Sequence, residues 1–216
     1  ELHQAFKDLL PQIHIQNNDF IRTTEARHQR VVQAALQQLF DAGDIYAEDY
    51  EGWYSTSAER FWTEKDLVDG KCPDTGQDVE KITERNYFFR MSKYEDALRS
   101  HIETNAEFIR PPHRANEVLG FLDNGLQDLC ISRPKARLSW GIELPFDRDY
   151  VTYVWFDALL NYVSALGYGA DDDRFETWWP HAHHLIGKDI LTTHSVYWTT
   201  MLLALGIPLP ESIIAH

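Results

Sequence analysis

The stretch LIGKDI, residues 185–190, combines residue types that suit the binding of an anion or a sugar hydroxyl. A strand, a glycine turn and a helix N-terminus would present free backbone N–H groups and the positive end of a helix dipole. Lys188 adds a positive charge, and Asp189 can accept hydrogen bonds from a sugar hydroxyl or an amine. The alternative is a simple turn between a strand and a helix, because one Gly-Lys-Asp lacks the spacing of a phosphate-binding loop.

Aromatic and apolar side chains recur at helical spacing near this stretch. Two sets are spaced four residues apart: Ile190, His194 and Trp198, and, just after Trp155, Ala158 and Tyr162. If both helices leave a sheet at its carboxyl edge, these faces converge on one aromatic pocket that holds a histidine. Such a pocket suits a polarizable, uncharged ligand such as a thioether, which gains sulfur–aromatic contacts. The alternative is an ordinary aromatic core with a satisfied histidine.

Three further histidines, His181, His183 and His184, raise the question of a metal site. His181 and His183 would share one side of a strand, but no carboxylate or cysteine lies at ligand spacing nearby, which favours a structural strand end. No Ser–His–Asp or Cys–His arrangement has a local context typical of nucleophilic catalysis. The sequence by itself thus offers no covalent protein nucleophile.

The final third of the chain predicts the elements that would hold these side chains. Residues 151–156 are β-branched and aromatic and predict a buried strand, followed by a helix that ends at Gly167. Residues 183–189 predict a second strand with a glycine turn, followed by a second helix. Strand–helix–strand–helix with short joins indicates a parallel, doubly wound α/β sheet. Ligands bind such sheets at the carboxyl ends of the strands, where Trp155 and residues 187–189 would lie.

The first two thirds of the chain predict a more varied set of elements. Alternating apolar residues predict a strand within 13–23, and Thr24 would cap a helix that runs to about Ala42. In residues 45–84, short aromatic pieces alternate with Gly, Pro and Asp turns, which predicts a small antiparallel insertion. The residues from Ser92 to Glu95 form a capping box and predict a helix start. Further elements are expected at three places: a strand at 86–90, a helix with Val118, Leu119 and Leu122, and a strand before Pro134.

Composition limits the class of protein. The 216 residues are 44% hydrophobic and 13% aromatic, enough to build a core, and no apolar run reaches the length that spans a bilayer. With only Cys72 and Cys130 as cysteines and no signal-peptide pattern, we expect a soluble cytoplasmic protein. The net charge of −14 repels phosphate backbones, so charge alone argues against direct nucleic-acid binding.

The stretches VTYVWFDALLNYVSAL (151–166) and HHLIGKDILTTHSVYW (183–198) closely resemble the catalytic core of the methionyl-tRNA synthetase family, of class I and bacterial type. Earlier blocks resemble other segments of that family in the same order: DFIRTTEARHQRVVQ, GWYSTSAERFWTEKDLVDGKCP, NYFFRMSKYEDAL and ISRPKARLSWGIELP. The resemblance implies a Rossmann-like, doubly wound catalytic domain in two parts, residues 1–44 and 151–216. Between them, residues 45–150 would form a mixed α+β connective peptide with a knuckle at about 50–80.

The resemblance also implies a reaction. Methionine and ATP, as its Mg²⁺ complex, would give methionyl-adenylate, and the methionyl group would then pass to tRNA(Met). The positions that match the family's methionine pocket are Trp155, Ala158, Leu159, Tyr162, Ile190, His194 and Trp198. Leu159 stands where many family members have Pro. Hydrophobic contact alone discriminates by only ~1–3 kcal/mol per methylene, so an aromatic pocket that closes on the thioether is a reasonable way to gain more.

The residues expected nearest to the reacting groups also come from the resemblance. Asp189 matches a residue beside the amino acid and the adenylate ribose, and Gly187 and Lys188 belong to the same ATP-binding loop. Arg133 matches an arginine that approaches the active site, so Asp189 and Arg133 are the expected catalytic residues. The first step needs a carboxylate positioned against the α-phosphate and developing charge stabilised by fixed donors. A covalent nucleophile is not required.

Two signature motifs of the family, His-Ile-Gly-His and Lys-Met-Ser-Lys-Ser, do not occur in the 216 residues. The resemblance places the first before Glu1 and the second after His216, and it places the anticodon-reading helical domain outside as well. We therefore expect this stretch alone to be inactive in adenylation, and much of the tRNA surface to lie elsewhere. Two alternatives stay open: a non-catalytic synthetase-like binding module, or a class I synthetase for leucine, valine, isoleucine or cysteine.

The knuckle raises a separate question about metal. In metal-binding relatives, Cys or His ligands stand at the positions of Ser55, Ala58, Cys72 and Thr75. Structural zinc needs four soft or imidazole ligands, and only Cys72 qualifies here, so we predict no zinc. The hairpins would then be held by packing of four aromatic residues: Trp53, Tyr54, Phe61 and Trp62.

Overall fold

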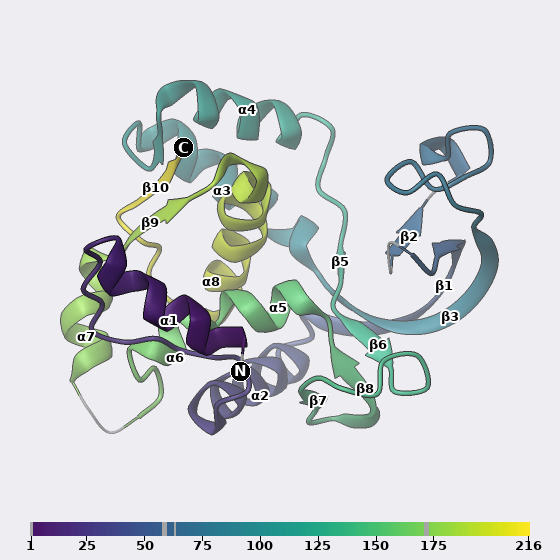
Figure 1. Cartoon of the computed structure of the whole chain (residues 1–216). Coiled ribbons are helices and arrows are strands. Elements are labelled where there is room, and N and C mark those ends of the chain that lie inside the picture. Colours follow the sequence, from purple (N-terminus) through teal and green to yellow (C-terminus); the bar gives the residue numbers. More distant parts are fainter. Residues whose placement is uncertain (1, 58–59, 63, 171–172) are drawn as a thin grey trace.

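Helices surround a small parallel sheet, and a long curved antiparallel ribbon lies to one side (Figure 1). The computed structural model describes residues 2–57, 60–62, 64–170 and 173–216. The α-helices are α1 (Leu2–Gln12), α2 (Ala26–Asp41), α3 (Glu95–Thr104), α4 (Pro112–Leu122), α5 (Val154–Leu159), α6 (Asn161–Ala165), α7 (Arg174–Trp178) and α8 (Thr199–Leu205). The short helical turns are η1 (Glu64–Asp66), η2 (Met91–Tyr94), η3 (Trp179–His181) and η4 (Lys188–Ile190), and η5 (Thr193–Trp198) is a π-helix. The strands are β1 (Ile45–Ser55), β2 (Arg60–Trp62), β3 (Glu80–Phe89), β4 (Ile109–Arg110), β5 (Leu129–Cys130), β6 (Ser132–Pro134), β7 (Glu143–Leu144), β8 (Asp147–Thr152), β9 (His183–Ile186) and β10 (Ser212–Ala215).

The parallel sheet has the strand order β4-β10-β9, with β10 in the middle. Both neighbours of β10 run parallel to it, and Ile213 pairs with Ile109 on one side and His184 on the other. Along β9 the side chains alternate between the two faces, so that His184 is buried while Leu185 is 78% exposed. The strand predicted to start at His183 is therefore confirmed, and residues 187–189 follow its carboxyl end.

The strand predicted at 151–156 is wrong in both extent and pairing. β8 ends at Thr152 and runs antiparallel to β6 and β7 in a separate three-stranded sheet. Tyr153 has extended backbone dihedrals and precedes α5 directly. The β-branched and aromatic residues here favour a strand, but strand preference yields to tertiary context. Trp155 therefore lies on a helix and not at the end of a parallel strand.

Helix α2 buries one face in the core. Its buried residues recur at helical spacing: His28, Val32, Ala35, Leu36 and Leu39. The predicted helix is confirmed, although it begins at Ala26 with Glu25 as its N-cap instead of Thr24. Gly43 follows its end with a φ of +74°, a left-handed conformation that glycine adopts without steric cost.

The strand predicted within 13–23 is not present. After α1 the chain forms turns and irregular backbone, and His14 adopts a φ of +58°. Ile13 and Ile15 are 51% and 46% exposed, so their alternation does not mark a buried strand face. Alternation is a reliable strand signal only where one face packs on a core.

The capping box predicted at Ser92 and Glu95 does not form. The Ser92 hydroxyl donates to the Asp128 carboxylate at 2.6 Å, and Glu95 Oε2 accepts the Leu126 N–H at 2.6 Å. Helix α3 begins only at Glu95, after the turn η2. The Ser92 and Glu95 side chains thus form hydrogen bonds with Asp128 and Leu126, which are distant in sequence, and not with each other's backbone at the helix end.

The antiparallel ribbon contains the insertion predicted for residues 45–84. β1 and β3 pair over their full length, from Ile45 with Phe89 to Tyr54 with Glu80. β2 and β5 flank them in the order β2-β1-β3-β5. Figure 1 shows the two long strands bowing away from the helices. The strands are longer than predicted, and β3 includes residues 86–89 of the strand expected at 86–90.

Candidate active site

Four side chains from three separate elements gather beside the parallel sheet. We call them the aromatic–histidine cluster: Tyr162 from α6, His184 from β9, and His194 and Trp198 from the π-helix η5. The Tyr162 ring lies 4.3 Å from His184, 5.7 Å from His194 and 5.9 Å from Trp198, between ring centroids. The structure thereby brings together three of the predicted pocket residues, and it adds His184.

Hydrogen bonds fix the protonation of His194. Its Nδ1 lies 2.9 Å from the carbonyl oxygen of Ile190, which can only accept, so Nδ1 carries the proton. Its Nε2 therefore accepts from the Tyr162 hydroxyl at 2.7 Å. Burial lowers the pKa of His194 and raises that of Tyr162, which keeps both groups neutral at pH 7.

His184 is a site residue that the sequence did not identify. Its Nε2 accepts the indole N–H of Trp198 at 3.0 Å, and it is 5% exposed. Burial, followed by the charges of His194 and His183, lowers the pKa of His184 to about 4. The cluster thus presents aromatic faces and neutral imidazoles, with no net charge. No sequence spacing links His184 to Trp198, since the contact depends on how β9 packs against η5.

The pKa of His184 gives a testable prediction. When the pKa of a histidine is lower in the folded protein than in the unfolded chain, the folded state is favoured most at a pH above the unfolded pKa. That contribution to stability is lost as the pH falls toward the folded pKa. The unfolded chain takes up a proton at His184 below about pH 6.5, whereas the folded protein does so only near pH 4, so stability should fall between these values by on the order of 3 kcal/mol. NMR titration of ¹³C-labelled histidines in the full-length protein, with His184→Gln to assign the signal, should give a midpoint near 4. A midpoint at or above 6.5 would contradict this description of the site.

The π-helix alters the predicted helical spacing. Ile190, His194 and Trp198 were expected on one face of an α-helix, but Ile190 belongs to η4 and the other two to η5. A π-helix has a wider turn than an α-helix and often occurs at functional sites. His194 and Trp198 still both contact Tyr162. The predicted convergence of these side chains is therefore found, although the local geometry differs.

Three of the remaining predicted pocket residues, Trp155, Ala158 and Leu159, lie on α5. Trp155 and Ala158 are half-buried, and Leu159 is 2% exposed and part of the hydrophobic core. Helix α5 packs against η5, the element that carries His194 and Trp198. Ile190 is half-buried and enters the site through its carbonyl oxygen, which accepts from His194.

The loop after β9 exposes Gly187, Lys188 and Asp189 to solvent. The predicted helix N-terminus is found, because helical backbone continues from η4 through η5 and α8 to Leu205, but two of its first N–H groups already have partners. The Lys188 N–H donates to the carbonyl of His216 at 3.0 Å, and the Ile190 N–H donates to that of Gly187 at 3.2 Å. The groups of this loop that can bind a polar ligand are therefore mainly the exposed side chains of Lys188 and Asp189.

The Arg133 side chain lies against the start of α5. It is 6% exposed, and its guanidinium carbon lies 4.2 Å from the ring centroid of Tyr153, the N-cap of α5. Its Nη1 donates to the carbonyl of Ser132 at 2.7 Å and to the Cys130 sulfur at 3.2 Å. Arg133 thus reaches the beginning of the helix that carries Trp155.

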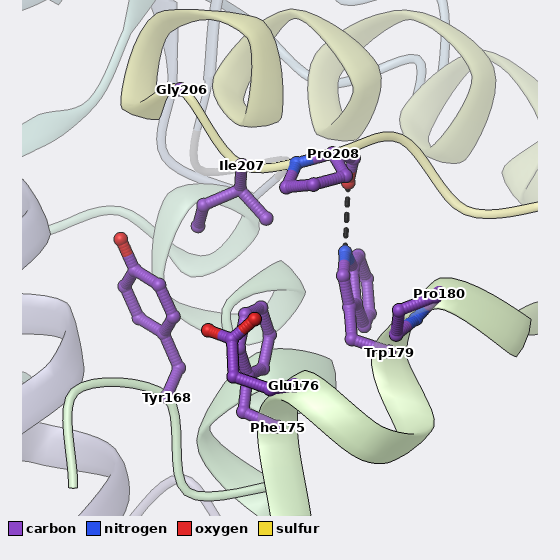
Figure 2. Close-up of a pocket in the computed structure, with 8 residues that line it drawn as sticks. All are labelled: Tyr168, Phe175, Glu176, Trp179, Pro180, Gly206, Ile207 and Pro208. Carbon is purple, nitrogen blue, oxygen red and sulfur yellow. Dashed lines mark hydrogen bonds between the residues drawn. The ribbon is translucent and has the colours of Figure 1, made fainter. Parts of the chain in front are cut away.

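A separate small hollow of about 150 Å³ lies between α7 and the loop after α8 (Figure 2). Tyr168, Phe175 and Trp179 line it, together with residues 206–208. The Trp179 indole N–H donates to the carbonyl of Pro208 at 2.8 Å, and its ring lies 6.1 Å from both His184 and Trp198. None of the predicted site residues lines this hollow, so it is not the candidate site.

Both ring nitrogens of His183 lie near protein partners. His183 Nδ1 lies 2.8 Å from the Ser212 hydroxyl, and its Nε2 lies 3.6 Å from the Glu211 carboxylate. Within the described ranges, no group of three or more His, Cys, Asp or Glu side chains could hold a metal ion.

The knuckle is built around hydroxyl groups. Cys72 is 1% exposed and its thiol contacts the hydroxyls of Ser55 and Thr75, while Ser57 bridges those two hydroxyls at 3.1 and 2.8 Å. Burial raises the pKa of Cys72, but hydrogen bonds from these hydroxyls and from backbone amides outweigh it and bring the pKa to about 7. Ala58 and the Phe61 side chain lie outside the described residues. Hydroxyls at two of the ligand positions do not suit structural zinc.

Metal analysis tests the expectation that Cys72 holds no zinc. The full-length protein and its Cys72→Ser variant should carry the same amount of zinc per chain, because a site with one thiolate and hydroxyl neighbours lacks the ligands that zinc requires. Loss of one zinc ion per chain in the variant would show that Cys72 is a ligand after all.

Comparison with known proteins agrees with the resemblance. A family model described as tRNA synthetases class I (M) matches residues 1–84 and 75–216. The methionine–tRNA ligases of Clostridium acetobutylicum and Caldanaerobacter subterraneus are 51% and 49% identical over 100% and 97% of this chain. The chain spans only 34% and 33% of those proteins, about a third of their length. A crystal structure of Mycobacterium tuberculosis methionyl-tRNA synthetase bound by methionyl-adenylate has a TM-score of 0.88 and 42% identity, covering 99% of this chain and 43% of that one. The chain therefore belongs to the methionyl family of the class I tRNA synthetases.

Proposed function

We propose that the full-length protein containing this chain is a methionine–tRNA ligase. It would activate methionine with ATP to methionyl-adenylate and transfer the methionyl group to tRNA(Met). The observation that carries the proposal is the uncharged aromatic–histidine cluster, in a chain that resembles a methionyl-adenylate-bound synthetase at a TM-score of 0.88. A neutral, polarizable lining suits a thioether and disfavours a charged side chain.

Tyr162, His194 and Trp198 would hold the methionine side chain, with Trp155, Ala158, Leu159 and Ile190 completing the pocket. Because His194 donates to Ile190 and accepts from Tyr162, the three groups hold one another in place before any ligand arrives. Such preorganisation lowers the entropic cost of binding. Leu159 would act mainly through packing, since it is 2% exposed.

The loop of Gly187, Lys188 and Asp189 would contact the adenylate. The exposed Asp189 carboxylate can accept hydrogen bonds from a ribose hydroxyl or from the methionine amino group. Lys188 supplies a positive charge next to it, and Arg133 supports the start of α5 through Tyr153. ATP would enter as its Mg²⁺ complex, in which the ion offsets phosphate charge.

No covalent protein intermediate is needed for this chemistry. Adenylation requires the methionine carboxylate close to the α-phosphate, in line with the leaving pyrophosphate. The chain's contribution would be to hold methionine by its side chain and the adenosine by its ribose. The catalytic domain would comprise residues 1–44 and 151–216, with the connective peptide at 45–150, in a cytoplasmic protein that also binds tRNA outside this segment.

Amino-acid-dependent exchange of pyrophosphate into ATP tests the proposal. The full-length protein should catalyse exchange with methionine and not with leucine, valine, isoleucine or cysteine. Exchange driven by one of those amino acids would assign a different class I synthetase. Absence of exchange with every amino acid would favour a non-catalytic, synthetase-like binding module.

A further inference from the structure

His28 occupies a position that no sequence pattern marks as functional. It lies on the buried face of α2 and is 0% exposed. Its Nε2 lies 2.6 Å from Asp157 Oδ1 on α5, and its Nδ1 lies 2.8 Å from Ser164 Oγ on α6. One imidazole thus joins three helices, and it does so with the residue types Ser, His and Asp.

This trio does not have the geometry of a hydrolytic triad. Ser164 is 2% exposed, so no substrate reaches its hydroxyl. Ser164 Oγ also lies 3.2 Å from the carbonyl of Asn161, one turn back on its own helix. A carboxylate oxygen accepts, so His28 Nε2 donates to Asp157 Oδ1. Both ring nitrogens of His28 thus have a partner, one in Asp157 and one in Ser164, which is the arrangement of a buried structural link.

The two helices that His28 joins are too short to fix their own geometry. α5 has six residues and α6 has five, and isolated helices of this length are not stable in water. They meet at Leu160, which belongs to neither helix. His28 contacts one residue on each side of that joint, so it constrains the angle between α5 and α6.

The predicted methionine pocket spans the same joint. Trp155 and Ala158 lie on α5 on either side of Asp157 in sequence, and Tyr162 lies on α6 two residues before Ser164. A change in the angle between the helices would move Trp155 relative to Tyr162. It would also disturb the hydrogen bond from Tyr162 to His194.

We propose that His28 is a positioning residue for the amino-acid pocket, acting through Asp157 and Ser164 and without touching the ligand. The proposal rests on the proposed function for the identity of the amino acid, methionine. It assigns to α2 a role in setting the angle between α5 and α6, the two helices that would line the pocket.

Kinetics of the full-length protein test this role. His28→Ala should raise KM for methionine about 10-fold in the exchange reaction and leave KM for ATP within about twofold, because the adenylate loop follows β9 and not α5. His28→Gln retains a donor at the position of Nε2 and should recover part of the loss through Asp157. Ser164→Ala, a substitution that a helix tolerates, should raise KM for methionine about threefold.

Leu39→Ala is the matched control. Leu39 is also 0% exposed on α2, at the opposite end of the helix from His28. The Leu39→Ala substitution should lower the melting temperature at least as much as His28→Ala does, and it should leave KM for methionine unchanged. If KM for methionine and KM for ATP rise together, or if Leu39→Ala has the same effect as His28→Ala, the positioning role is overturned.

Hydrogen exchange without substrates separates this proposal from the proposed function. In His28→Ala, the amides of residues 154–165 should exchange at least 10-fold faster, while those of α8 stay as slow as in the wild type. If His28→Ala changes the hydrogen-exchange rates of residues 154–165 and of α8 by the same factor, the positioning role is overturned. If the wild type lacks methionine-dependent activity, the proposed function fails, and the exchange of residues 154–165 still decides whether His28 orders α5 and α6.

Discussion

Asp189→Ala in the full-length protein is expected to lower methionine-dependent pyrophosphate exchange by about 10²- to 10³-fold, the usual effect of removing one well-placed polar group at a reacting centre. The Asp189 carboxylate is exposed after β9, where a bound adenylate would need an acceptor for its ribose hydroxyls or for the amino group. Asp189→Asn keeps one acceptor oxygen without the charge and should lose less activity, about 10-fold. Steady-state kinetics with methionine and ATP varied in turn would measure both effects.

Asp123→Ala provides the control for this prediction. Asp123 is an exposed carboxylate at the end of α4, paired with Arg99, and it belongs to no predicted site. It should leave exchange within about twofold of the wild type. If Asp189→Ala retains more than a tenth of wild-type activity, the proposed role of Asp189 in holding the adenylate is wrong.

Trp198→Ala is expected to raise KM for methionine about 100-fold, with a further loss of stability. Trp198 is 0% exposed and donates to His184, so its removal deletes a wall of the cluster and leaves the imidazole unpaired. Aromatic-to-alanine changes in a core cost about 3–5 kcal/mol, so the melting temperature should fall too. Trp198→Phe keeps an aromatic wall and should raise KM for methionine only about 10-fold.

The exposed Trp178 separates site effects from general effects of removing a tryptophan. Trp178 is 62% exposed at the end of α7, so Trp178→Ala should change neither KM for methionine nor the melting temperature appreciably. An unchanged KM for methionine in Trp198→Phe and Trp198→Ala would remove the main support for an aromatic methionine pocket.

The long helix α2 and the strand β9 are parts of the fold that the sequence predicted well. The buried face of α2 and the parallel strand from His183 follow directly from helical and strand periodicity. The strand predicted at 151–156 failed because strand preference is a property of packing, and here the chain turns into α5 after Thr152. The capping box at Ser92 did not form: α3 begins only at Glu95, and the Ser92 hydroxyl donates to Asp128.

Residues of the candidate site that lie close together in the sequence, such as His194 and Trp198, were predictable from their spacing. The position of Tyr162 after Trp155 and the polar turn at Asp189 were also visible in the sequence. The family resemblance added Leu159 and Arg133. The contact of His184 with Trp198 and the link from His28 to Asp157 and Ser164 depend on how distant elements pack. Such contacts leave no local pattern, because the partners stand far apart in the chain.

The most direct test of the central claim is to locate the bound amino acid in the full-length protein. Crystals grown with selenomethionine as the ligand should give one anomalous selenium peak at that ligand, about 5 Å from the rings of Tyr162 and Trp198. Norleucine, which lacks the heavy atom, should give no peak in the same crystals. A peak over the hollow lined by Phe175 and Trp179, or anywhere else away from the aromatic–histidine cluster, would contradict the assignment of that cluster as the methionine pocket.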